Sequence, residues 1–123
     1  MPNVVVTGGV IQCSHSGQIQ FSSGSSQLEV SGSQAITFGM EAGLVFGPPA
    51  PSPGLITPCT ATMPNGNPSP CTSSPAEAGV STLLLIGEVG ALLDNATGLT
   101  VNPAGPGTWS IASAGQTLLE VDE

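Results

Sequence analysis

Short apolar runs separated by glycine and serine follow one another along most of the chain. In several runs apolar and polar residues alternate, as in QIQF at residues 18–21 and QLEV at residues 27–30. Alternation with a period of two is typical of a strand that buries one face. No window sustains a capped amphipathic helix, so the pattern predicts an all-β fold. The expected strands cover residues 4–6, 10–11, 19–21, 28–30, 35–38, 82–86, 91–93, 99–101 and 108–111.

Turn-forming residues stand between these strands. The segments SHSG at residues 14–17 and SSGS at residues 22–25 have the composition of hairpin turns. Further along, Asp94-Asn95 and the segment GPG at residues 105–107 are expected to separate the later strands. The sequence therefore predicts a small domain of short strands and hairpins.

The chain divides into three parts of one expected domain, residues 1–123. Residues 1–46 form a first β unit, residues 47–79 a proline-rich loop, and residues 80–123 a second β unit. Alone, the middle part would be interpreted as a disordered linker. However, it contains Cys59 and Cys71 and is flanked by strands, and a long loop inside a compact domain needs a tether. We expect a bound metal to provide it.

Composition limits the size of the core. The chain has 123 residues, with three phenylalanines, one tryptophan and no tyrosine, against 17 glycines and 12 prolines. Large apolar side chains are therefore scarce. A core this small usually needs a metal, a disulfide or a partner surface to be stable.

The charge balance excludes several classes of function. The chain has no lysine or arginine and eight acidic residues, which gives a net charge of −8. Binding a nucleic-acid backbone requires cationic side chains that displace counterions, so neither DNA nor RNA is an expected partner. The same absence argues against phosphoryl transfer and against docking on anionic membranes.

Targeting signals are also missing from the sequence. The first residues lack the positive region and the long apolar run of a signal peptide. The most apolar stretch, residues 83–93, contains Glu88 and is too short for a transmembrane helix. We therefore expect synthesis and folding in the cytoplasm. Cysteines stay reduced there, which favours metal binding over disulfides.

One set of residues has the composition of a metal site. Cys13, His15, Cys59 and Cys71 comprise every cysteine and the only histidine of the chain. A Cys₃His set is a complete ligand shell for tetrahedral zinc, with iron as the alternative metal. Four protein ligands leave no open position for water, so the expected site is structural and the protein is not expected to be an enzyme.

Two other interpretations remain open at this stage. One is a Cys59–Cys71 disulfide with a free Cys13, and His15 as an ordinary surface or core residue. The other is a hydrolase that uses Ser14 or Ser16 with His15 and Asp94. The second is disfavoured because serine is common here and no Gly-x-Ser-x-Gly motif accompanies these residues.

Two segments resemble the signatures of a known family. Residues 8–17, GGVIQCSHSG, look like the opening of PAAR-like proteins, which form the spike tips of type VI secretion and other contractile injection systems. Residues 84–96, LLIGEVGALLDNA, resemble the second signature of that family, and Ala114-Gly115-Gln116 matches its Gly-Gln ending. The resemblance spans nearly the whole chain, although each motif is short.

The resemblance implies a specific architecture and role. Members of the family form a cone of short β-hairpins, with a metal site near the apex and a broad base on a trimeric β-helical spike. Carried over to this chain, Cys13, His15, Cys59 and Cys71 are the expected zinc ligands. Typical members use more histidines than cysteines, and they tend to carry arginine. Because this chain has no arginine, its contact with the spike is expected to be apolar and hydrogen-bonded.

The expected function is therefore a non-enzymatic tip that caps and sharpens the spike and aids membrane puncture. One copy would sit on each spike, with effector proteins as further partners and only transient contact with the target membrane. The tip would assemble in the cytoplasm and act outside the cell or after injection. The alternative is a phage- or virion-type adhesin or minor tail protein that binds a surface partner and needs no metal.

Overall fold

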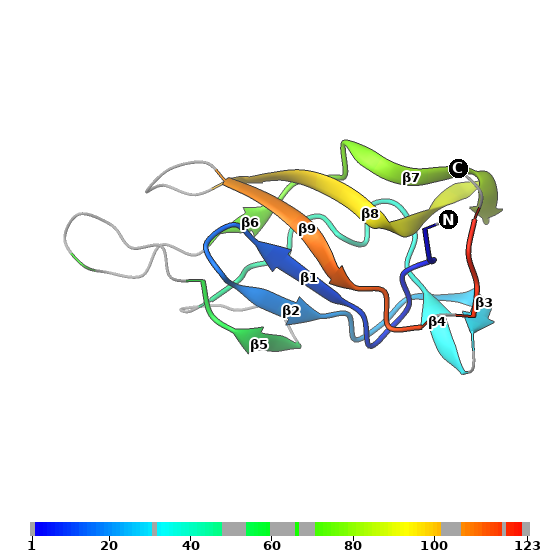
Figure 1. The fold of residues 1–123 in the computed structure, drawn as a ribbon, viewed down its shortest axis with the longest axis horizontal. Helices are drawn as coiled ribbons and strands as arrows, with labels where there is room; N and C mark the ends of the chain where they lie inside the picture. Colours follow the sequence, from blue (N-terminus) through cyan, green and yellow to red (C-terminus); the bar gives the residue numbers. More distant parts are fainter. Residues whose placement is uncertain are drawn as a thin grey trace.

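The computed structural model describes residues 2–30, 32–47, 54–59, 66, 71–101, 107–116 and 118–121. These residues form β-strands and no helix (Figure 1), which confirms the all-β class. Most of the prolines of the expected loop lie outside the described residues. The strands are β1 (Val10–Cys13), β2 (Gln18–Gln20), β3 (Ser25–Val30), β4 (Ser33–Ala35), β5 (Leu55–Thr57), β6 (Thr72–Ser73), β7 (Ala78–Ile86), β8 (Val89–Val101) and β9 (Gly107–Ser113).

Seven of these strands form one antiparallel sheet. Its order is β5-β2-β1-β9-β8-β6, and β7 also pairs with β8. Strands β3 and β4 form a separate hairpin. The large sheet joins the beginning of the chain to its end, because β1 pairs with β9 and places Cys13 opposite Trp109. Strands β5 and β6 form within residues 47–79 and attach this part to β2 and β8.

The apolar segment at residues 4–6 runs through the core without forming a regular strand. Val4, Val5 and Val6 have no exposed surface. Their amides donate to the carbonyl groups of three separate segments, at Leu119, Leu92 and Ala114. Because successive valines form hydrogen bonds with different parts of the chain, residues 4–6 make isolated β-bridges only. The expectation of a strand here was wrong, since its hydrogen-bond partners do not belong to one neighbouring strand.

Two expected turns are also corrected. Residues 22–25 do not connect a hairpin, because β2 pairs with β1 and β5 while β3 pairs with β4. Asp94 and Asn95 do not end a strand, because β8 continues through them from Val89 to Val101. Asp94 lies opposite Asn3, whose carbonyl accepts its amide hydrogen bond. A polar pair thus continues the strand where the sequence predicts a turn.

The core has two clusters of buried residues. One surrounds Trp109 and Phe46 and includes Cys13 and Cys71. The other contains Val4, Leu93 and their neighbours. Figure 1 places the β1–β2 turn and β6 at one end of the long axis of the molecule, and the β7–β8 turn with β3 and β4 at the other. None of the described segments is a helix of the length and apolar character needed to cross a membrane.

Candidate metal centre

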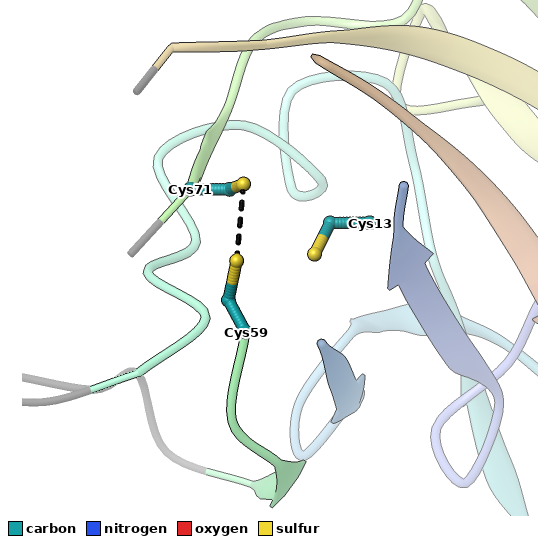
Figure 2. Close-up of side chains that lie close together, drawn as sticks. All are labelled: Cys13, Cys59 and Cys71. Atoms are coloured by element: carbon teal, nitrogen blue, oxygen red, sulfur yellow. Dashed lines mark hydrogen bonds between the residues drawn. The ribbon is translucent and has the colours of Figure 1, made fainter. Parts of the chain in front are cut away.

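The three cysteines converge at the end of the molecule that carries the β1–β2 turn. Cys13 ends β1, Cys59 follows β5 and Cys71 precedes β6. Their sulfur atoms all lie within 4.8 Å of one another, and Figure 2 shows them pointing toward a common space. The Sγ atoms of Cys59 and Cys71 are 3.3 Å apart. The three cysteines therefore lie close together in space, as the sequence predicted.

A tight hairpin turn fixes Cys13. The amide of Cys13 donates to the carbonyl of Gly17 across 2.9 Å, and the amide of Ser16 donates to the carbonyl of Cys13 across 3.1 Å. Ser16 has a positive φ of 70°. It is the third residue of a three-residue hairpin loop, and this position commonly adopts a positive φ. The turn brings the amide of Gly17 to within 3.1 Å of Cys13 Sγ, to which it donates a hydrogen bond. Such a bond orients a thiolate and stabilises its negative charge.

The backbone of Phe46 holds the other two cysteines in place. Its amide donates to the carbonyl of Cys71 across 3.0 Å, and its carbonyl accepts the amide of Cys59 across 2.6 Å. Cys71 is buried and Cys59 is half-buried. Phe46 itself is fully buried beside Trp109 in the core. The positions of Cys59 and Cys71 are therefore coupled to the packing of the core.

His15 lies next to the cysteines. Its Nδ1 atom is 3.1 Å from Cys71 Sγ, although the two residues are 56 positions apart in the chain. The first residue of β9, Gly107, lies close to the same turn. A Cβ added to Gly107 would stand 3.2 Å from Cε1 of His15 and 2.5 Å from Oγ of Ser14. The fourth residue of the expected ligand set thus contacts the cysteine cluster, at Cys71.

The three clustered cysteines could bind a metal ion. Two thiolates bound to zinc at about 2.3 Å each have sulfurs about 3.8 Å apart. The Cys59 and Cys71 sulfurs are 3.3 Å apart, and all three sulfurs lie within 4.8 Å of one another. His15 Nδ1 lies 3.1 Å from Cys71 Sγ, but the group of donor atoms within 4.8 Å of one another contains the three cysteines and not His15. Three sulfurs and an imidazole nitrogen suit zinc or iron better than calcium or magnesium, which prefer oxygen ligands.

Electrostatics at the site favours a cation. Burial raises the pKa of the Cys13 thiol from 9.0 to about 12; hydrogen bonds from the backbone of His15 and Gly17 lower it, and the neighbouring Cys71 and Cys59 raise it. Burial is the largest of these effects, and with a pKa of about 12 the Cys13 thiol stays protonated at neutral pH in the metal-free protein. A bound dication would reverse this balance, because it stabilises the thiolate form.

Of the two alternatives from the sequence, the hydrolase gains no geometric support, whereas the sulfurs of Cys59 and Cys71 lie 3.3 Å apart. No disulfide joins the three cysteines in the structure. The side chain of His15 faces Cys71, whereas the carboxylate of Asp94 accepts a hydrogen bond from Asn3 across 3.4 Å. Ser14 Oγ accepts the amide of Thr108 across 3.2 Å. These contacts give Ser14 and Asp94 structural partners.

Sequence reasoning missed the residues that support the cysteines. Gly17 is one, because a Cβ there would meet Cys13 Sγ at 2.9 Å and the amide nitrogen of Cys59 at 3.1 Å. Glu41 is another. It is fully buried, its carboxylate accepts amides from Gly39 and Ala76, and its carbonyl accepts the Ser73 hydroxyl. A lone glutamate between methionine and alanine carries no sequence signal for this role.

Comparisons of the chain with protein-family models, with curated proteins and with solved structures gave no match.

Proposed function

We propose that this chain is a non-enzymatic, metal-stapled tip of a contractile injection system, similar to PAAR-like proteins. In this proposal it caps a trimeric β-helical spike, one copy per spike, and sharpens it for membrane puncture. The observation that carries the proposal is the cluster of three cysteine sulfurs, from segments far apart in the chain, at one end of an all-β molecule. Effector proteins are further proposed partners.

A structural metal suits the mechanical task. A puncturing tip must resist unfolding under load and has no need for turnover. In the proposed site, Cys13, His15, Cys59 and Cys71 hold one zinc ion and tie the β1–β2 turn to the segments around β5 and β6. Metal binding then supplies folding free energy to a core with few large side chains. The proposed cone has its apex at this end, with the proline-rich loop tied to it.

The opposite end offers an apolar surface for the spike. In the β7–β8 hairpin, Leu83 is 70% exposed, Leu85 is 57% exposed and Val89 is 38% exposed. Exposed apolar residues grouped in one element are characteristic of interaction surfaces. Because the chain has no lysine or arginine, the proposed spike contact is apolar and hydrogen-bonded, and any ion pair would need a cation from the spike.

The metal content of the purified protein tests the proposed structural metal site. We would purify the protein without chelator or added metal and measure it by native mass spectrometry and elemental analysis. The proposal predicts one tightly held zinc or iron per chain, retained in Ser110→Ala, an exposed position on β9, and lost in Cys59→Ser. A metal-free wild-type chain that is folded would count against the staple and would favour a metal-independent adhesin or minor tail protein.

The position of the chain on contractile particles tests the proposed role as a spike tip. Contractile particles would be isolated from cells that produce this chain with an epitope tag, and the tag would be located by electron microscopy with antibody labelling. We expect label at the spike end and about one chain per spike by quantitative mass spectrometry. Intact spikes without the chain, accompanied by free chain in solution, would refute this role even if the metal were present.

A further inference from the structure

We propose that Cys59 and Cys71 form a redox-active dithiol, which closes to an intramolecular disulfide in the presence of a disulfide oxidant such as oxidised glutathione, while Cys13 remains a thiol. The inference rests on the arrangement of the three sulfurs. It requires neither the injection-system role nor a bound metal.

The sulfurs of Cys59 and Cys71 are in contact. They are 3.3 Å apart, and a disulfide bond is about 2.05 Å long, so they must approach by about 1.3 Å. The main chains of both residues are held by hydrogen bonds to Phe46. These bonds persist when the side chains rotate toward each other. The disulfide therefore forms without separating either segment from the core.

Cys13 is the least suited of the three to join a disulfide. It ends β1, which is paired with β2 on one side and β9 on the other. Its sulfur accepts a hydrogen bond from the amide of Gly17. Figure 2 shows its sulfur apart from the Cys59–Cys71 contact. Cys59, by contrast, is half-buried and is the thiol that an oxidant in solution reaches first.

The reaction is a two-step thiol–disulfide exchange. The Cys59 thiolate attacks one sulfur of oxidised glutathione, which forms a mixed disulfide and releases one glutathione thiolate. Cys71 then loses its proton and attacks Cys59 Sγ, which forms the Cys59–Cys71 bond and releases the second glutathione. Two protein thiols are oxidised, one oxidant disulfide is reduced, and the two protons are taken up by the two glutathione thiolates.

The disulfide and a metal ion would exclude each other, because the disulfide consumes two of the three thiolate ligands. Either a bound metal or the disulfide can therefore connect the segments that carry Cys59 and Cys71. In a reducing compartment the thiols remain available to a metal. In an oxidising one the segments at Cys59 and Cys71, 12 positions apart, become covalently joined.

The sequence allows a direct test of the pairing. Cyanogen bromide cleaves after methionine, and Met40 and Met63 divide the chain into fragments that each contain one cysteine. Reduced protein, freed of metal by a chelator, would be incubated with oxidised glutathione, alkylated with iodoacetamide in denaturant, cleaved and weighed by mass spectrometry. We expect fragment 41–63 linked to fragment 64–123, with alkylated Cys13 on the first fragment. Thiol titration should fall from three thiols per chain to one.

Variants complete the test. Cys13→Ser should form the same link, whereas Cys59→Ser should form no link within the chain. A disulfide that includes Cys13 in the wild type, a stable glutathione adduct on Cys59, or three alkylated cysteines after excess oxidant would each overturn the inference. Metal content is measured separately, so a chain that binds no zinc but forms the link refutes the metal proposal only.

Discussion

The amide of Gly17 donates a hydrogen bond across 3.1 Å to Sγ of Cys13, four residues earlier in the chain. Gly17 also has no room for a side chain. A Cβ at this position would stand 2.9 Å from the same sulfur, 2.9 Å from Cβ of Phe46 and 3.1 Å from the amide nitrogen of Cys59. At Gly17, therefore, the β1–β2 turn packs closely against the segment that carries Cys59.

Gly17→Ala should weaken both metal binding and folding. The added methyl group forces apart Cys13 and Cys59, and overpacking of this kind costs about 1–3 kcal/mol of unfolding free energy. Cobalt titration followed by absorbance would measure affinity, and denaturant unfolding would measure stability. Ser110→Ala, at an exposed position on β9, is the control and should change neither quantity. Equal cobalt affinity in the wild type and Gly17→Ala would contradict the prediction.

His15→Ala should lower zinc affinity more than it lowers the stability of the metal-free protein. The imidazole lies beside Cys71 Sγ. Residues that merely support a ligand contribute roughly 10–100-fold to affinity, so removal of a ligand should cost at least that much. Competition with a chromogenic chelator gives the affinity. The d–d bands of the cobalt-loaded protein should also change, because one nitrogen donor is lost. Unchanged bands and affinity would leave His15 outside the site.

Glu41 should be a strong determinant of stability although it lies outside the ligand set. Its carboxylate accepts the amide of Gly39 across 2.7 Å and that of Ala76 across 2.9 Å. Glu41→Gln turns an NH₂ group toward one of these donors and should cost about 1–3 kcal/mol. Glu41→Ala leaves both amides unpaired and a cavity, and should cost about 3–5 kcal/mol.

Thermal and denaturant unfolding would measure the Glu41 variants. Glu77→Gln and Glu88→Gln, at exposed positions, serve as controls and should change stability by less than about 0.5 kcal/mol. A Glu41→Gln variant as stable as these controls would show that the buried carboxylate is dispensable.

Trp109 should report on the packing behind the site. It is 1% exposed, and its indole Nε1 donates to the carbonyl of Ser74 across 2.9 Å. Gly98 lies opposite it on β8, and a Cβ there would stand 2.4 Å from Nε1. Gly98→Ala should therefore displace the indole, cost about 1–3 kcal/mol and shift the tryptophan emission to longer wavelength.

This is the only tryptophan of the chain, so its fluorescence is unambiguous. Ser110→Ala, exposed beside Trp109 on β9, is the control and should leave the emission unchanged. If Gly98→Ala kept the wild-type emission maximum and stability, the close contact between β8 and the indole would be refuted.

The strands that the sequence predicted well are those with local alternation. In β1 buried and less buried residues alternate, and Ile19 of β2 is buried between two more exposed glutamines. The turn between them was also predicted, because its serine and glycine composition acts locally. Strands β5 and β6 were missed. They are short and lie in a proline-rich segment, and they exist because β2 and β8 offer them hydrogen-bond partners.

By itself, the sequence determined the all-β class and the membership of the cysteine cluster. Strand periodicity is a local property, and a set of three cysteines and one histidine offers few other ligand combinations. Only the tertiary structure decided that β8 runs through Asp94, that residues 4–6 thread the core, that Phe46 holds Cys59 and Cys71, and that Glu41 is buried. Each of these depends on hydrogen bonds between residues distant in the chain, and such partners are set by the packing of the whole molecule.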